Sequence, residues 1–184
     1  MTEEERQLFM RLPVLTEVGG PRQLPDGYEL RIADRSEYAG VGSVLSAAFE
    51  EPWDELRVEQ ELGPSKGVEA VFVVAGRPGV VATASARLLP ATYPGSGYVH
   101  YVGVHPDARG RAFGEAVSVA VVHYFANRGL TDAVLETDAF RIPALRTYFR
   151  LGFVPEYRQS NDAARWSRVM RALFARGVGG SVAK

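Results

Sequence analysis

The sequence predicts an α/β (α+β) fold, a mixed sheet with helices on both of its faces. Two apolar, β-branched runs at 68–75 and 80–89 are joined by Gly76-Arg77-Pro78-Gly79, which is a strong hairpin signal. Segments with helical spacing of apolar residues alternate with further short strands around this hairpin. The resulting order, β-α-α-β-β-β-α-β-α-β, favours a mixed sheet in one domain.

The chain before the hairpin begins with an arm and continues into a strand and two helices. In the arm, residues 1–26, Leu8, Phe9 and Leu12 are spaced for one face of a helix. Three more elements are expected before the hairpin: a strand at 27–33, a helix at 34–49 and a short helix at 54–62.

The chain after the hairpin alternates strands and helices. The expected elements are strands at 98–104, 133–137 and 153–157, helices at 114–128 and 142–151, and an amphipathic helix at 162–176. The apolar stripe of the last helix packs either on its own domain or on a second copy, which would give a homodimer. We divide the chain into an arm (1–26), a central domain (27–157), and a C-terminal helix and tail packed on the same domain (158–184).

Composition argues against several classes of protein. The 184 residues carry a formal net charge of −1, which disfavours non-specific binding to nucleic acid or to an anionic membrane. The absence of cysteine removes disulfides, thiolate metal sites and a cysteine nucleophile. Three scattered histidines without clustered carboxylates predict no metal site. A cytoplasmic protein is expected, because no apolar run approaches the roughly 20 residues of a membrane-spanning helix and the N-terminus is acidic.

The stretch 102–114 ends a strand, forms a short basic loop and begins a helix. Successive backbone N–H groups in such a loop converge at the positive end of the helix dipole, which makes an anion site. Gly110 and Gly114 allow close approach of a ligand, and Arg109 and Arg111 add charged donors for phosphate. The alternative, from these residues alone, is a solvated turn with two surface arginines.

Four residues further along are spaced like a second motif: Ala144, Tyr148, Gly152 and Phe153. Together with Arg109-Gly-Arg-Ala-Phe-Gly114, they resemble the GNAT (GCN5-related N-acetyltransferase) family. In that family an Arg/Gln-x-x-Gly-x-Gly/Ala loop holds the pyrophosphate of coenzyme A, and a later helix carries Ala-x-x-x-Tyr-x-x-x-Gly-Phe. The direct match covers 100–157, and the predicted elements extend it to 27–157. The resemblance implies the GNAT fold, a mostly antiparallel sheet with splayed central strands, and acetyl-CoA as donor substrate.

The resemblance also implies which residues bind the cofactor. They are Val102, Val104, Arg109, Gly110, Arg111, Ala112, Phe113, Gly114 and Arg141. Ala112 stands where the family usually has a glycine, and alanine costs on the order of 1 kcal/mol if that position needs a positive φ. If Ala112 instead has the helical conformation, its methyl group only crowds the phosphate. Arg141 stands where the family often has an asparagine, and it either reaches a phosphate or is solvated.

By the same resemblance, Tyr148 lies beside the thioester sulfur. A phenol with a pKa near 10 can act as hydrogen-bond donor or proton source to a thiolate whose thiol has a pKa near 8.5. The alternative is a core tyrosine. Gly103 suggests a bulge. In the family a bulge there splays two strands, lets the pantetheine arm pair with the backbone of Val102 and Val104, and frees an N–H for the thioester carbonyl.

The acceptor side is less defined. His100 is a candidate base, similar in place to a base histidine of the arylalkylamine branch, or else a half-exposed strand residue. Glu136 is a rival base, and Glu50, Glu51 or a water chain are further options. The remaining candidates, Phe49 and Trp53, either line the acceptor pocket or pack on the core.

The expected function is acetyl-CoA-dependent N-acetyl transfer to an amine of a small molecule or peptide, by direct attack in a ternary complex. The alternative is a non-catalytic acetyl-CoA-binding or interaction module with the same fold. The expected partners are acetyl-CoA and the amine, without nucleic acid, membrane or metal.

Overall fold

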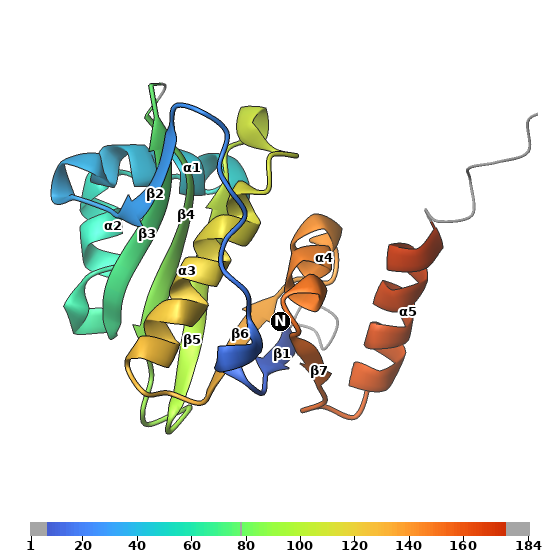
Figure 1. The fold of residues 1–184 in the computed structure, drawn as a ribbon. Helices are drawn as coiled ribbons and strands as arrows, with labels where there is room; N and C mark the ends of the chain where they lie inside the picture. Colours follow the sequence, from blue (N-terminus) through green and yellow to red (C-terminus); the bar gives the residue numbers. More distant parts are fainter. Residues whose placement is uncertain (1–6, 78, 176–184) are drawn as a thin grey trace, which may run out of the picture.

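The computed structural model describes residues 7–77 and 79–175, in which the chain forms a seven-stranded sheet of order β2-β3-β4-β5-β6-β1-β7 (Figure 1). The strands are β1 (Leu8–Leu12), β2 (Tyr28–Ile32), β3 (Val68–Gly76), β4 (Gly79–Leu88), β5 (Ser96–Val104), β6 (Asp132–Thr137) and β7 (Val154–Glu156). The helices are α1 (Tyr38–Phe49), α2 (Glu55–Glu61), α3 (Phe113–Asn127), α4 (Ile142–Arg150) and α5 (Asp162–Phe174). β5 and β6 are parallel and the other neighbouring pairs are antiparallel, which confirms the mixed sheet.

Helices cover both faces of the sheet, as expected. α3 and α4 share one hydrophobic core with the strands, to which they contribute Val117, Val121, Phe125, Leu145 and Tyr148. α1 and α2 form a second core on the opposite face, with Val41, Leu45 and Val58 packed on Val71 and Val73 of β3.

The N-terminal segment is strand β1, so the helix predicted around Leu8, Phe9 and Leu12 is wrong. β1 lies inside the sheet and runs antiparallel to both β6 and β7. Leu8 and Met10 are fully buried in the main core, whereas Phe9 packs on the opposite face. Because both faces are occupied, the run Leu-Phe-Met-Arg-Leu lacks the polar alternation of a half-exposed strand, and its apolar spacing also fits a helix.

β5 and β6 separate after a short paired region. They pair only at 96–98 with 132–134, so residues 99–104 of β5 and 135–137 of β6 run apart. We call this region the splay, and it confirms the predicted divergence of the central strands. The register of β5 against β4 also shifts there, which marks a bulge. The bulge predicted at Gly103 lies just before it, where Tyr101 has a φ of 47°.

The segment between β1 and β2 crosses the outer side of α3 (Figure 1). The carbonyl oxygen of Val18 lies 3.0 Å from Nε2 of His123 on α3. Arg22 pairs with Glu115 in the first turn of the same helix, with 3.0 Å between Nε and Oε1. This crossing connects β1, which lies between β6 and β7, to β2 at the opposite edge of the sheet.

Helix α5 follows β7 and packs beside α4. Trp166 and Val169 of its apolar stripe are buried in the main core, with the Trp166 ring 6.0 Å from the ring of Phe149. The helix ends at Phe174, and the predicted end at Arg176 lies outside the described residues. Among the residues that the structure describes, no helix is long and apolar enough to cross a membrane.

Candidate active site

The loop between β5 and α3 leads into a helix start that no side chain caps. Gly110 and Ala112 both have positive φ, at 79° and 60°. Ala112 is the N-cap of α3 and makes no side-chain cap hydrogen bond, while Arg109 before it is exposed. The position therefore needs the left-handed conformation, and alanine there costs on the order of 1 kcal/mol. The first N–H groups of α3, at the positive end of the helix, can receive an anion.

Several arginines surround this helix start. Arg111 donates from Nη1 to the hydroxyl of Tyr28 over 3.1 Å. Glu115 pairs with two other arginines, Arg22 and Arg150, at 3.0 Å each. Sequence reasoning missed Arg22 and Arg150, because one comes from the segment that crosses α3 and the other from α4.

The backbone of β5 next to this loop is open toward β6. Val102 lies in the bulge and has no register partner on β4 or β6, and Val104 is in register only with Ala82 of β4. An unpaired strand edge of this kind can accept an extended chain as an added strand. A Cβ atom at Gly114 would come within 3.1 Å of Val104, so a glycine allows α3 to begin this close to β5.

Tyr148 is buried on α4, with 6% of its surface exposed. Its ring lies 5.9 Å from that of Phe153. Burial raises the pKa of the Tyr148 phenol well above its ordinary value, against a smaller opposite effect of Arg141. The phenol is therefore neutral, and its hydroxyl makes no hydrogen bond within the described residues, so a ligand can receive its proton in a hydrogen bond.

Arg141 connects the two sides of the splay. Its Nε donates to Asp138 just after β6 over 2.8 Å, and its Nη1 donates to the carbonyl oxygen of Ala48 in α1 over 3.0 Å. Its guanidinium carbon lies 4.4 Å from the ring centroid of Phe49. The side chain of Arg141 is thus directed toward the end of α1.

His100 lies half-buried on β5. Burial, with the nearby charge of Arg87, lowers the pKa of His100 to about 3. Arg87 Nη1 is 3.4 Å from Nε2 of the imidazole, and Nδ1 is buried without a hydrogen-bond partner among the described residues. The ring is therefore neutral at ordinary pH and has little tendency to take up a proton.

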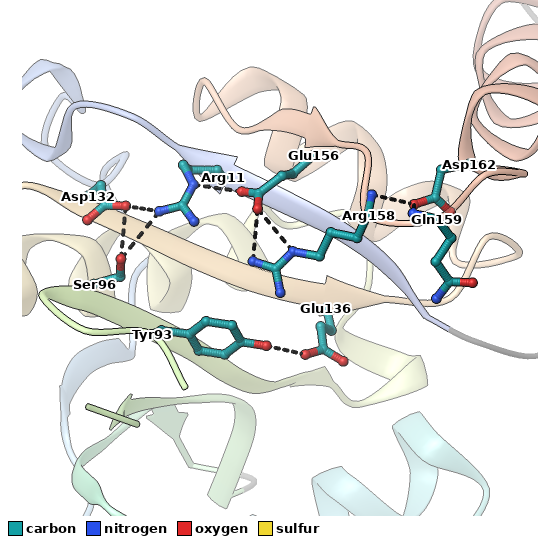
Figure 2. Close-up of polar contacts among 9 residues, drawn as sticks. All are labelled: Arg11, Tyr93, Ser96, Asp132, Glu136, Glu156, Arg158, Gln159 and Asp162. Atoms are coloured by element: carbon teal, nitrogen blue, oxygen red, sulfur yellow. Dashed lines mark hydrogen bonds and ion pairs between the residues drawn. The ribbon is translucent and has the colours of Figure 1, made fainter. Parts of the chain in front are cut away.

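Glu136 lies on β6, on the face opposite α3. Its Oε1 accepts a hydrogen bond of 2.8 Å from the hydroxyl of Tyr93 (Figure 2). It has no cationic partner among the described residues. Phe9 of β1 is its register partner and packs on Tyr93, with ring centroids 5.5 Å apart. Sequence reasoning missed Tyr93, which comes from a turn, and Phe9, which was assigned to a helix.

Phe49 and Trp53 form one aromatic group with Tyr101. The ring of Tyr101 lies edge-on to both, at 5.5 Å from Phe49 and 4.8 Å from Trp53. It also lies 4.1 Å from the ring of His100, so the bulge of β5 joins this group to the strand. Trp53 is buried, with Arg57 stacked over its ring at 4.1 Å.

The acids near Trp53 have structural partners. Glu51 pairs with Arg57 at 2.9 Å, and Asp54 caps α2 by accepting from the backbone of Arg57. Glu50 takes the left-handed conformation that ends α1. Glu51 and Asp54 are thus engaged in contacts within the protein.

A polar network fixes β1 and β7 on the far side of the splay (Figure 2). Arg11 donates to Asp132 and, over 2.7 Å, to Glu156, and Glu156 also accepts from Arg158. The guanidinium of Arg158 lies 3.2 Å from the ring centroid of Phe9. Burial works against the charge of Glu156, but the two arginines outweigh it and lower the pKa of its carboxyl.

No group of three or more metal-ligating side chains that could hold a metal ion is found in the parts of the chain that the structure describes.

Comparison with known proteins identifies similar chains. The model of the acetyltransferase (GNAT) family matches residues 38–153. A mycothiol acetyltransferase of Thermobispora bispora is 31% identical over 168 residues, which cover 83% of this chain and 55% of that protein. One of Arthrobacter sp. (strain FB24) is 46% identical over 61 residues, 33% of this chain and 19% of that protein.

Among solved structures, a GCN5-related N-acetyltransferase from Sphaerobacter thermophilus superposes with a TM-score of 0.64 at 21% identity, over 82% of this chain and 49% of that one. At this identity the likeness supports the fold alone. The chain spans about half the length, or less, of these relatives. The family match covers more than half of this chain, and the chain therefore belongs to the acetyltransferase (GNAT) family.

Proposed function

We propose that this chain is an acetyl-CoA-dependent N-acetyltransferase that transfers the acetyl group directly to an amine in a ternary complex. One observation carries the proposal: the unpaired edge of β5 leads straight into the uncapped start of α3. This arrangement suits a ligand with an extended amide-bearing arm and a pyrophosphate, which is the chemistry of coenzyme A. The cofactor residues are then Val102 and Val104 through their backbone, and 109–114 through the loop.

In this mechanism the amine nitrogen attacks the thioester carbonyl carbon and forms the C–N bond. The C–S bond then breaks, and coenzyme A leaves as its thiolate. A backbone N–H freed by the bulge of β5 stabilises the oxyanion. Tyr148 donates a hydrogen bond to the departing sulfur. Because burial raises the pKa of its phenol, full proton transfer to the thiolate is uphill, and hydrogen bonding is the larger contribution.

The acceptor ammonium must lose a proton before attack. Glu136 is the better candidate base, since it lies beside the splay without a cationic partner in the described chain. His100 is the weaker candidate, because an imidazole with a pKa of about 3 holds a proton poorly. The acceptor is an amine of a small molecule or peptide. The curated relatives are named mycothiol acetyltransferase, which makes a small-molecule amine the first class to test.

The test is thiol release from acetyl-CoA with a broad panel of amines. We expect turnover with at least one amine and a loss of roughly 100-fold in kcat for Tyr148→Phe, which removes the hydroxyl and keeps the ring. Unchanged turnover in this variant would remove Tyr148 from the mechanism. A protein that acetyl-CoA stabilises thermally, but that releases thiol with no amine, would instead be the non-catalytic module that the strained Ala112 motivates.

A further inference from the structure

Arg141 differs from the other charged groups near the splay in the way it is held. A carboxylate (Asp138), a carbonyl oxygen (Ala48) and an aromatic ring (Phe49) all contact its guanidinium. They come from both sides of the splay, because Asp138 follows β6 and α1 packs on β4 and β5. The side chain is nonetheless 24% exposed. A guanidinium fixed in this way is a preformed fork for a planar anion.

These contacts leave some N–H donors of the Arg141 guanidinium without a partner among the described residues. Nε and Nη1 of Arg141 each have one partner, and Nη2 has none among the described residues. Arg57 is a useful contrast, because it also stacks on an aromatic ring of the same group. Its Nη1 donates to Pro52 over 2.6 Å and its Nη2 to Glu51 over 2.9 Å, so both of its terminal nitrogens are engaged.

Arg141 lies on the segment that leads from β6 into α4, the helix that carries Tyr148, and its charge acts on the phenol of Tyr148. Five positions earlier, on β6, Glu136 has no cationic partner in the described part of the chain. An arginine that keeps free donors beside its ion pair with Asp138, and a carboxylate without a cationic partner among the described residues, thus border the same splay. A ligand with one ammonium and one carboxylate matches this pair of charges.

We propose that Arg141 binds a carboxylate of the acceptor, so that the acceptor is an amine that also carries a carboxylate, such as a free amino acid. The inference rests on the proposed function and narrows its substrate class. The ammonium is directed toward Glu136 and the carboxylate toward Nη2 of Arg141. This role differs from the cofactor contact that the family resemblance implies for the position.

The test compares each free amino acid of a panel with its C-terminal amide, by thiol release from acetyl-CoA. The amine of the amide is less basic, so chemistry alone favours the amide. We expect the wild-type chain to prefer free acids roughly tenfold or more in kcat/KM. Arg141→Gln should lower kcat/KM for the acid by roughly 10- to 100-fold and for the amide by less than about threefold. The KM for acetyl-CoA should not change.

Arg57→Gln is the matched control, because it removes an arginine with a similar ring contact but no free terminal nitrogen. We expect it to leave the acid-to-amide ratio unchanged. A wild-type preference for amides or for amines without a carboxylate would overturn the inference, and so would an equal loss for acid and amide in Arg141→Gln. A raised KM for acetyl-CoA in that variant would overturn it in favour of a cofactor role. Absence of thiol release with every amine would count against the proposed function itself.

Discussion

The two walls of the splay are built in opposite ways. The near wall consists of β5 and α3, which follow one another in the sequence within 96–127 and are joined by one loop. The far wall joins β6 and β7 to β1, which comes from the other end of the chain. Residues of β1 pair with residues of β6 that lie more than 120 positions later in the sequence. The near wall presents backbone N–H groups and glycine, where we propose that acetyl-CoA binds. The far wall presents charged and aromatic side chains, held by the network around Arg11 and Glu156 (Figure 2).

In the proposed function, this difference separates the groups that bind the donor from the groups that select the acceptor. Backbone groups and a helix start recognise a pyrophosphate and an amide arm, which are the same for every acyl-CoA. Side chains on the far wall can change without disturbing that recognition. We therefore expect changes on the far wall to act on the acceptor, and changes on the near wall to act on acetyl-CoA.

Among the changes that compare the two walls, Glu136→Gln should have the largest effect on kcat. The amide keeps the hydrogen bond from Tyr93 but cannot take a proton, so we expect kcat to fall by roughly 100- to 10,000-fold. The KM for acetyl-CoA should stay the same. His100→Gln, on the near wall, should cost less than tenfold, and the wild-type rate should show no His100 titration above pH 5, because its pKa is about 3. Steady-state kinetics of both variants measures this, and a larger loss in His100→Gln would reverse the assignment of the base.

Met10→Ala tests whether β1 is integral to the domain. Met10 on β1 and Leu145 on α4 are both fully buried in the same core. Truncating either should lower the free energy of unfolding by about 2–5 kcal/mol in one cooperative transition. Urea denaturation of Met10→Ala beside Leu145→Ala makes the comparison. If Met10→Ala cost less than about 0.5 kcal/mol, or unfolded in a separate step, β1 would be an accessory strand.

The sequence was most informative where the signal is local. The hairpin, the helices, the strands that become β5, β6 and β7, and the loop before α3 follow from periodicity, glycine and one family pattern. Strand β1 of the far wall was missed, because its pairing partners are distant in sequence and the apolar spacing of its five residues fits both a helix and a buried strand. Tyr93 escaped notice in a turn, and the direction of Arg141 depends on Ala48, a backbone carbonyl that no side-chain pattern identifies.

Ala112→Gly should have the smallest effect, and it lies on the near wall. The sequence left two conformations open for this residue, and the structure has the left-handed one, with φ at 60°. Glycine removes the strain, so we expect the free energy of unfolding to rise by about 1 kcal/mol. Ala120→Gly, within α3, should instead lower it by about 1 kcal/mol. Thermal and urea denaturation measure both, and a loss of stability in Ala112→Gly would mean that the residue is helical in solution. Because the strain lies in the loop proposed for acetyl-CoA, acceptor preference should be the same before and after the change.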